Sequence, residues 1–234
     1  MKLKKILLNL FLLILSALII IGGIIVFQGY QMYQAALGQT SVEDMADNVR
    51  SQPGFTPLEE LPELYLEAVV AVEDQRFYEH GGVDLIAILR AVWNDLRSFS
   101  LAEGGSTITQ QVAKNLYFTQ ERTATRKIAE ILMARQLEKH LDKDEILELY
   151  VNSIYFGNGY YQVSAACEGY FHKQPKDMTD SECTMLAGIP NAPSVYAPTV
   201  NPDLAVKRQK KVLSQMVDQG FLSEEEASEI LGQE

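Results

Sequence analysis

An apolar segment near the N-terminus constrains this chain more than any other feature. From Ile6 to Phe27 the only polar side chains are those of Asn9 and Ser16. A helix that rises about 1.5 Å per residue would reach roughly 33 Å over this length, enough to cross the hydrocarbon core of a bilayer. The segment therefore predicts a single transmembrane helix over residues 6–27.

A cleaved signal peptide is the alternative interpretation of this segment. Signal peptides usually have an apolar region of about 7 to 15 residues that ends at an Ala-x-Ala-like site. Here the run is longer and continues into Gln28-Gly29-Tyr30 without such a site, which favours an uncleaved anchor. Lysines at positions 2, 4 and 5 precede the run, and the positive-inside rule keeps them in the cytoplasm. We expect residues 1–5 to be a cytoplasmic tail and the chain after residue 28 to be extracytoplasmic.

The net charge excludes one broad class of partner. The 234 residues carry a net charge of −11. Without the three leading lysines, 17 basic residues face 31 acidic ones, so the exported part is near −14. Such a domain is a poor candidate for nucleic-acid binding, and we expect no nucleic acid among its partners. An anionic substrate would need a local basic site.

The two cysteines, Cys167 and Cys183, fall within predicted helices. An oxidising exterior permits a disulfide between them. Two cysteines make no disulfide framework, however, and no metal-ligand spacing is present. We favour two small buried residues and expect no certain metal ligand.

The remaining chain has a helical pattern. Residues 28–57 are mixed and polar and end in SQPGFTP, which is typical of a linker. Residues 58–234 have no sustained alternation of apolar and polar residues, so we expect one mainly α-helical domain. Capping-box pairs at 142/145, 179/182 and 223/226 mark three helix starts. The segments SLAEGGST (100–107) and GIPNAPSVYAPTVNP (188–202) are expected to be loops. Helices are expected at residues 61–79, 84–99, 107–118, 125–140, 143–152, 161–171, 180–188, 203–219 and 224–231.

The stretch AVEDQRFYEHGG (71–82) places two acids where an apolar run ends. On a continued helix Glu73, Phe77 and His80 would share one face through spacings of four and three. A carboxylate beside aromatic rings is partly desolvated, which raises its pKa and suits it to general base catalysis. Spacing alone also fits a solvated helix end.

Two further stretches could bind an anion. In EGGSTITQQVAKN (103–115) a glycine turn leads into a helix that begins with hydroxyl side chains and carries a lysine one turn later. In ERTATRKIAEIL (121–132) Glu130 lies four residues after Arg126 and three after Lys127. Each pattern also has an ordinary structural reading, as a capped helix in the first case and a surface ion pair in the second.

Five stretches taken together carry a resemblance. They are, in order, EDQRFYEHGGVD, GGSTITQQVAKN, RKIAE, ILELYVNSIYFGNGYYQVSAAC and AGIPNAPSVYAP. The chain resembles the peptidoglycan glycosyltransferase family, which comprises the transglycosylase domain of bifunctional penicillin-binding proteins and its monofunctional relatives. The resemblance covers roughly residues 58–220. No S-x-x-K transpeptidase segment occurs before Glu234, so we expect a monofunctional enzyme or the first part of a longer one.

The resemblance implies a two-lobed, lysozyme-like helical domain preceded by one N-terminal transmembrane helix, with the smaller lobe dipping into the bilayer. It implies polymerisation of lipid II into β-1,4 glycan strands, with inversion and release of undecaprenyl pyrophosphate. Glu73 corresponds to the catalytic base that deprotonates the acceptor 4-hydroxyl, and Glu130 to the second essential carboxylate. Lys114 and Arg122 match positions that hold the pyrophosphate.

Other positions carry over with supporting roles. Asp74, Phe77 and His80 are expected to shape the site, and Asp74 to position its neighbours rather than to act as the base. Family members in some cases use a divalent cation, Mg²⁺ or Mn²⁺, at the pyrophosphate. Expected partners are lipid II, the growing lipid-linked glycan, the membrane and other cell-wall synthesis proteins. The substrate-binding motif and its surroundings comprise Ser106, Thr107, Gln110, Gln111, Asn115, Arg126 and Lys127.

Two other functions stay open at this point. A lysozyme-like lytic enzyme acting on finished glycan would also need a carboxylic acid. A non-catalytic, membrane-anchored lipid II-binding scaffold could keep the same fold.

Overall fold

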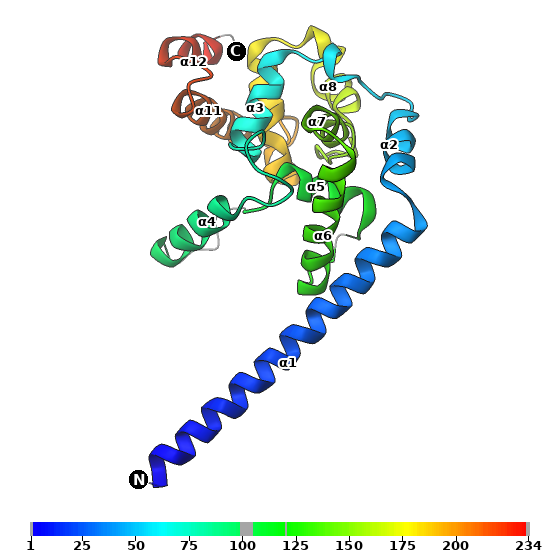
Figure 1. Cartoon of the computed structure of the whole chain (residues 1–234). Helices are drawn as coiled ribbons and strands as arrows, with labels where there is room; N and C mark the ends of the chain where they lie inside the picture. The colour runs from blue at the N-terminus through cyan, green and yellow to red at the C-terminus, as the bar shows by residue number, and fades with distance from the viewer. Residues whose placement is uncertain (1, 99–104, 120, 233–234) are drawn as a thin grey trace.

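The computed structural model describes residues 2–98, 105–119 and 121–232. Within these residues all regular secondary structure is helical, which confirms the mainly α fold class. One long helix leads to a bundle of shorter ones (Figure 1). The α-helices are α1 (Lys2–Gln39), α2 (Val42–Arg50), α3 (Glu63–Glu73), α4 (Leu85–Ser98), α5 (Ile108–Tyr117), α6 (Ala124–His140), α7 (Lys143–Val151), α8 (Val163–Phe171), α9 (Asp180–Gly188), α10 (Pro193–Tyr196), α11 (Pro202–Asp218) and α12 (Glu224–Leu231). Short 3₁₀ helices are η1 (Leu58–Glu60), η2 (Pro175–Asp177) and η3 (Ile189–Asn191).

The hydrophobic core lies between helices that are distant in sequence. Helix α9 packs against α3 and α11, while α5 packs against α6 and α7. Tyr65 of α3, Tyr150 of α7 and Phe156 after α7 are among the largest side chains that are fully buried. This arrangement brings the C-terminal end of α3 next to the start of α5.

Both cysteines are buried and free, which confirms their interpretation as small core residues. The Cys167 thiol donates a weak hydrogen bond to the Met178 sulfur at 3.4 Å. Burial raises the pKa of Cys167 and of Cys183 to about 12, so both remain thiols at neutral pH.

Capping boxes begin the helices where the sequence predicts them. The pairs Asp142/Glu145, Thr179/Glu182 and Ser223/Glu226 each form both reciprocal hydrogen bonds. A fourth box, Thr107 with Gln110, begins α5. Of the two expected loops, residues 99–104 lie outside the described residues, and residues 188–202 contain η3 and α10.

Residues 28–57 differ from the expected linker. Helix α1 continues to Gln39, and α2 follows after two residues with Ser41 as its N-cap. One face of α2, formed by Val42, Met45, Ala46 and Val49, is buried in the core. The segment is therefore part of the domain, because its apolar side chains recur at helical spacing and α2 packs against α6 and α7.

The helix expected at 61–79 is also shorter than predicted, since α3 ends at Glu73. Asp74 leaves the helical conformation, with φ −158° and ψ 77°. Its side chain turns to accept a hydrogen bond from the Ile108 amide at the start of α5, 3.0 Å away. Residues 74–80 therefore form a turn, and Phe77 and His80 do not share a helix face with Glu73.

Helix α4 projects from the body of the domain (Figure 1). Its start is held by the Asp84 carboxylate, which accepts hydrogen bonds from the amides of Ile86 and Ala87 and from both Arg76 Nε and Nη2. Burial opposes ionisation, but these donors outweigh it and lower the pKa of Asp84 to about 2. Among the described side chains of α4, the apolar ones of Leu85, Ile86, Leu89 and Trp93 are exposed.

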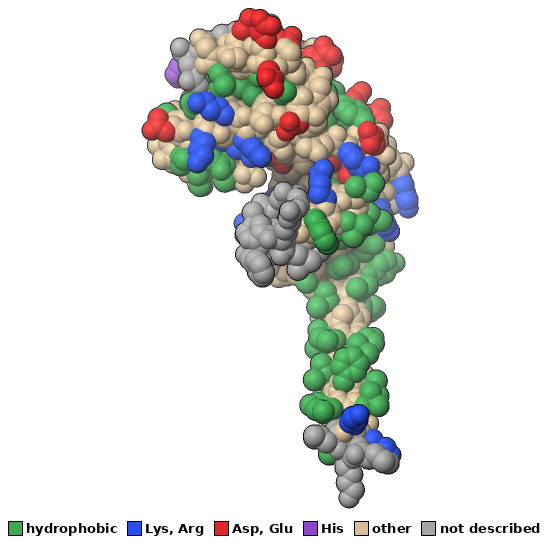
Figure 2. All heavy atoms as spheres, turned by 90° about the vertical axis from the view of Figure 1, so that its left-hand side faces the viewer, with side chains coloured by type: hydrophobic (Ala, Val, Ile, Leu, Met, Phe, Trp, Pro, Cys, Tyr) green, Lys and Arg blue, Asp and Glu red, His purple; other side chains and the backbone are tan. Residues whose placement is uncertain are grey.

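Helix α1 is long and apolar enough to cross a membrane from Lys4 onward, and its most apolar window is not buried by the rest of the chain. Figure 2 shows apolar side chains covering this helix, and basic ones between it and the acidic side chains at the far end of the molecule.

A core substitution tests whether α2 belongs to the folded domain. We expect Met45→Ala to lower the free energy of unfolding by about 2 to 5 kcal/mol, because a buried side chain is replaced by a cavity. Asp47→Ala, on the exposed face of the same helix, should change stability by less than about 0.5 kcal/mol. Equal effects in chemical denaturation would show that α2 does not contribute to the core.

Candidate active site

Glu73 ends α3 at the centre of the candidate site. Its Oε2 accepts a hydrogen bond of 2.7 Å from the Gln111 side chain on α5. Its Oε1 is buried and has no hydrogen-bond partner among the described residues. Burial raises the pKa of Glu73, although the Gln111 hydrogen bond and the charges of Arg208 and Lys114 oppose the rise. The result is a carboxylate with a free, desolvated oxygen and a raised proton affinity, which suits a general base.

Asp74, the neighbouring acid, is saturated with structural contacts. Its Oδ1 lies 2.7 Å from His80 Nε2, and its Oδ2 accepts the hydrogen bond from Ile108 N. The second ring nitrogen of His80 contacts the Gly81 carbonyl oxygen. Burial lowers the pKa of His80, but the hydrogen bonds to Asp74 and Gly81 outweigh it and the pKa is raised. Asp74 and His80 thus form a short hydrogen-bonded pair beneath the site, which is an ion pair when the imidazole is protonated.

Phe77 is fully buried and packs within the core, and the Lys143 ammonium lies 4.5 Å from its ring centre. It therefore supports the turn that follows Glu73, and its ring is enclosed by the core.

The start of α5 supplies polar side chains to the same region. Thr107 caps the helix and also donates a hydrogen bond to the Gly82 carbonyl oxygen, 2.9 Å away. Gln110 is buried and Ser106 partly buried, and both accept hydrogen bonds from Lys127 Nζ, at 3.2 and 2.8 Å. Lys127 therefore joins the turn before α5 to the first turn of α6.

Glu130 is buried on α6 and is paired with two cations. Its Oε1 lies 2.7 Å from Arg126 Nε and its Oε2 lies 3.2 Å from Lys127 Nζ. The side chain of Glu130 is only 3% exposed, so its carboxylate is buried, unlike that of the surface ion pair that spacing alone allowed. The local charge is positive, because one carboxylate faces two cations.

Lys114 links the two halves of the site. Burial lowers the pKa of its ammonium group, while the charges of Glu130 and, more weakly, Glu73 raise it. Lys114 therefore lies within electrostatic reach of both acids, on the α5 face that also carries Gln111. Asn115 and Arg122 make no side-chain hydrogen bond or ion pair among the described residues, and Arg122 is exposed just before α6.

Arg208 on α11 is a site residue that the sequence reasoning missed. It interacts electrostatically with Glu73, and burial lowers the pKa of its guanidinium group. Its Nε donates to the Gly188 carbonyl oxygen at 3.2 Å, and its guanidinium carbon lies 5.8 Å from the Tyr196 ring centre. The basic run KRQKK at 207–211 was the available signal, but helical spacing does not say which of its members turns inward.

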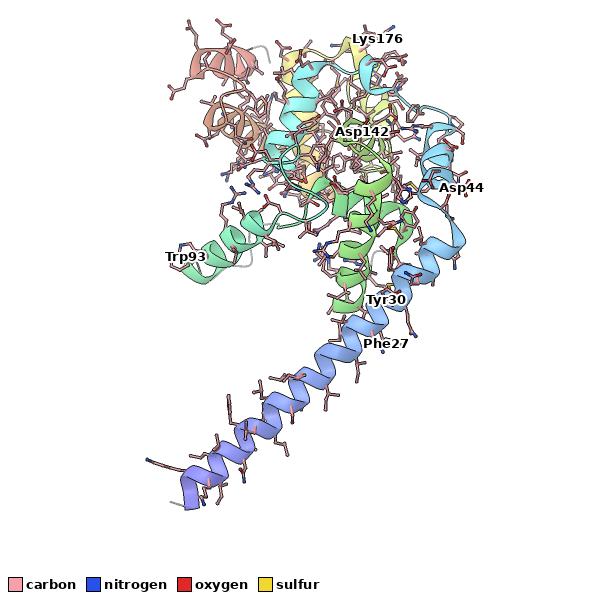
Figure 3. The ribbon with its side chains drawn as sticks, in the orientation of Figure 1. Phe27, Tyr30, Asp44, Trp93, Asp142 and Lys176 are labelled. Carbon is pink, nitrogen blue, oxygen red and sulfur yellow. The ribbon has the colours of Figure 1, made fainter. Side chains whose placement is uncertain are left out.

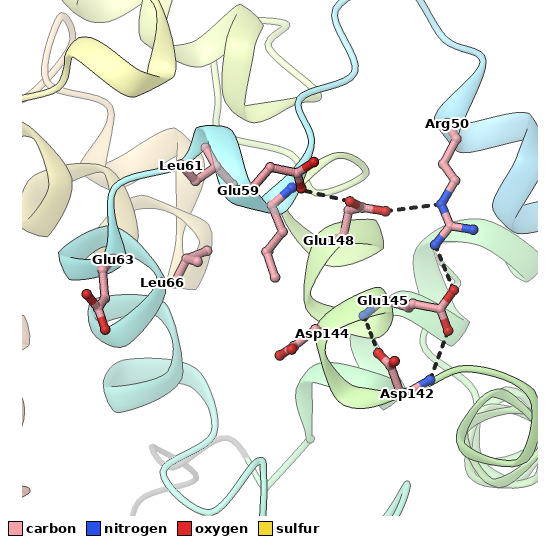
Figure 4. Close-up of a pocket in the computed structure, with 10 residues that line it drawn as sticks. Arg50, Glu59, Leu61, Glu63, Leu66, Asp142, Asp144, Glu145 and Glu148 are labelled. Carbon is pink, nitrogen blue, oxygen red and sulfur yellow. Dashed lines mark hydrogen bonds and ion pairs between the residues drawn. The ribbon is translucent and has the colours of Figure 1, made fainter.

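A separate pocket of about 520 Å³ lies between η1, α3 and α7 (Figure 4). There Arg50 pairs with Glu145 and Glu148 at 3.0 and 3.1 Å, and Glu148 also accepts a hydrogen bond from the Leu58 amide. Glu145 thus does more than cap α7, since it also helps to hold α2. None of the residues that line this pocket belongs to the site around Glu73.

Comparison with known proteins identifies the family. The family model described as Transglycosylase matches residues 40–217. The chain belongs to the transglycosylase family. The match begins before α2, in agreement with the inclusion of α2 in the domain.

This transglycosylase is similar to longer proteins. It is 42% identical to Penicillin-binding protein 1F of Bacillus subtilis, over 97% of this chain and 33% of that protein. It is 46% identical to Penicillin-binding protein 1A of Neisseria lactamica, over 77% of this chain and 23% of that protein. The crystal structure of Penicillin-binding protein 1A from Haemophilus influenzae matches 76% of this chain and 17% of that one, with 25% identity and a TM-score of 0.46. The chain thus spans a third or less of the length of these relatives.

The Asp74 contacts predict a structural cost for removing its charge. Asp74→Asn presents one amide nitrogen toward either Ile108 N or His80 Nε2, so one buried donor loses its acceptor. We expect a loss of about 1 to 3 kcal/mol in the free energy of unfolding, measured by denaturant titration. Asp218→Asn, at an exposed position on α11, is the matched control. Equal stabilities of the two variants would contradict the assignment.

Proposed function

We propose that this transglycosylase is a membrane-anchored peptidoglycan glycosyltransferase that polymerises lipid II. The observation that carries the proposal is the placement of Lys114 between a desolvated carboxylate, Glu73, and a cationic cluster around Glu130. The transfer needs a base for the acceptor hydroxyl and positive charge for an anionic leaving group, and the two halves of the site supply them.

The reaction is a single displacement at the donor's anomeric carbon. Glu73 Oε1 takes the proton of the acceptor 4-hydroxyl while that oxygen bonds to the anomeric carbon. The bond from this carbon to the lipid pyrophosphate breaks, and Lys114, Arg126 and Lys127 compensate the charge that the leaving group gains. Inversion of an α-linked donor yields a β-1,4 linkage. Lipid II and the growing lipid-linked glycan are the proposed substrates, and Arg122 is proposed to contact the pyrophosphate from the exposed side.

The proposed topology places the substrate in the outer leaflet. Residues 1–5 lie in the cytoplasm, residues 6–27 cross the membrane, and the catalytic domain is extracytoplasmic. The exposed apolar side chains of α4 support contact between the projecting helix and the bilayer. Other cell-wall synthesis proteins are proposed as further partners.

A divalent cation at the pyrophosphate, Mg²⁺ or Mn²⁺, would find few free ligands among the residues that the structure describes. Both oxygens of Glu130 are paired with Arg126 and Lys127. Asp74, His80 and Asp84 have ligand atoms within 4.8 Å of one another, but each is already engaged within the protein. We propose that any cation here would be held mainly by the diphosphate oxygens.

The main test is polymerisation of lipid II by the Glu73→Gln variant. We expect the rate of glycan formation to fall by about 100- to 10,000-fold, because the base is removed while the shape of the side chain is kept. Glu63→Gln, at the exposed other end of α3, should retain full activity. The assay is run with added Mg²⁺ and with a chelator, and thermal unfolding confirms that both variants fold.

Two outcomes would favour the other functions. Release of muropeptides from cell-wall sacculi in the absence of lipid II would support a lytic enzyme. Binding of lipid II without turnover by the unsubstituted chain would support a scaffold. Full polymerase activity in Glu73→Gln would rule out Glu73 as the base.

The contacts of Glu73 also predict a pH dependence. A base must be ionised, so kcat/KM should fall as the pH drops through the raised pKa of Glu73. In Gln111→Leu the ionised Glu73 carboxylate loses its hydrogen bond, so the pKa of Glu73 rises further. The acid limb of the pH profile of kcat/KM then moves to higher pH. Gln174→Leu, at an exposed position outside the site, should leave the limb in place. A limb that does not move in Gln111→Leu would show that another group controls it.

A further inference from the structure

The contact between the anchor helix and α6 has an unusually close point at Gly29. Helix α1 packs along α6 beyond the end of the apolar run. A β-carbon at residue 29 would lie 2.6 Å from Ile128 Cβ and 2.9 Å from the Thr125 carbonyl oxygen. Real β-carbon contacts do not reach such distances, so only glycine allows this approach.

The contact between α1 and the rest of the domain continues beyond Gly29. Tyr33, Ala36 and Leu37 of α1 are partly buried against the domain core. The Tyr33 hydroxyl lies 3.5 Å from the Gln136 side-chain oxygen on α6. Beyond the end of α1, His140 of α6 contacts Glu43 of α2 at 2.6 Å. The anchor is therefore packed against α6 over several turns, rather than attached by a flexible connection.

The position of the close contact relates the site to the bilayer. Gly29 lies two residues beyond Phe27, where the apolar run ends. Figure 3 shows Phe27 and Tyr30 on the stretch of α1 that passes α6. On α6, Thr125 and Ile128 flank Arg126 and Lys127, the two cations paired with Glu130. The contact thus fixes these cations near the level at which α1 leaves the hydrocarbon, which is where the diphosphate of a membrane lipid lies.

We propose that Gly29 is a positioning residue that sets the depth of the cationic cluster relative to the membrane surface. The inference rests on the proposed function, because it assumes a lipid-linked diphosphate donor. A larger side chain at residue 29 must push α6 away from α1 or tilt α1 against the domain. Either change moves Arg126, Lys127 and Glu130 out of register with a diphosphate whose height is fixed by the bilayer.

The test compares two substrates with one variant, Gly29→Leu. For lipid II in vesicles we expect kcat/KM to fall by about 10- to 100-fold, as for other small misplacements of reacting groups. For a lipid II analogue with a short, water-soluble chain, in detergent, kcat/KM should stay within about twofold of the unsubstituted enzyme, since no bilayer fixes the height of the donor. Gly23→Leu and Gly38→Leu are matched controls, because a β-carbon at either position would meet no atom within 4 Å.

A second measurement reports depth directly. A fluorophore on Glu121→Cys, an exposed position just before α6, is quenched by lipids spin-labelled at the headgroup. We expect Gly29→Leu to change the quenching, and the two control variants to leave it unchanged.

The outcomes separate the inference from the proposed function. Loss of activity confined to vesicles, with altered quenching, supports a positioning role. Equal loss with both substrates shows a merely structural role and overturns the inference, as does full activity in vesicles. If the unsubstituted enzyme polymerises neither substrate, the proposed function fails and the positioning of α6 is not the cause.

Discussion

The rest of the site depends on the hydrogen bonds that the Asp74 carboxylate makes at the end of α3. Asp74 ends α3, because its carboxylate turns to bind the first amide of α5 and the ring of His80. The same turn leaves Glu73 as the last residue of α3, facing Gln111 across the junction. Both oxygens of the Asp74 carboxylate have a hydrogen-bond partner, His80 Nε2 for one and the Ile108 amide for the other. These partners make burial of the carboxylate possible. The chemical difference between adjacent acids thus arises from their partners: Asp74 is saturated, and Glu73 keeps one oxygen free.

Most helices were predictable because their local signals agree. The capping boxes at Asp142, Thr179 and Ser223 each mark the start of one helix, and each of these helices is present in the structure. Two of the differences from the prediction, at residues 74–80 and at α2, came from tertiary contacts. Residues 74–80 have a helix-compatible pattern, but the hydrogen bond to Ile108 replaces the helix. Helix α2 is short and mostly polar, so its four buried side chains gain their importance only from packing against α6 and α7.

In the site, too, some features could be predicted from the sequence and others depend on tertiary packing. The motifs placed Glu73, Lys114 and Glu130 in one region. The packing of α5 against α6 and the hydrogen bond from Gln111 to Glu73 bring them together. Spacing could not predict that Glu130 is buried, because the i,i+4 pair with Arg126 has the same spacing on a solvated helix. Nor could it identify Arg208, which approaches Glu73 from α11, far away in sequence. Both facts depend on which helix faces are covered.

The electrostatic state of the site indicates what it is arranged to receive. Glu73 has a raised pKa, while Lys114 and Arg208 have lowered ones, and in each case burial is the largest cause. Desolvated charges destabilise a fold unless partners compensate them, and Glu73 Oε1 has none among the described residues. A hydroxyl group that donates a hydrogen bond to Glu73, and an anion beside Lys114, would each compensate for the hydration that these side chains lose on folding. The proposed pair of ligands, an acceptor sugar and a diphosphate donor, would supply both groups, and their binding would then relieve this cost while it aligned the reacting atoms. Under the proposed function, the buried charges of Glu73, Lys114 and Arg208 would be electrostatically preorganised for the transfer before the substrates bind.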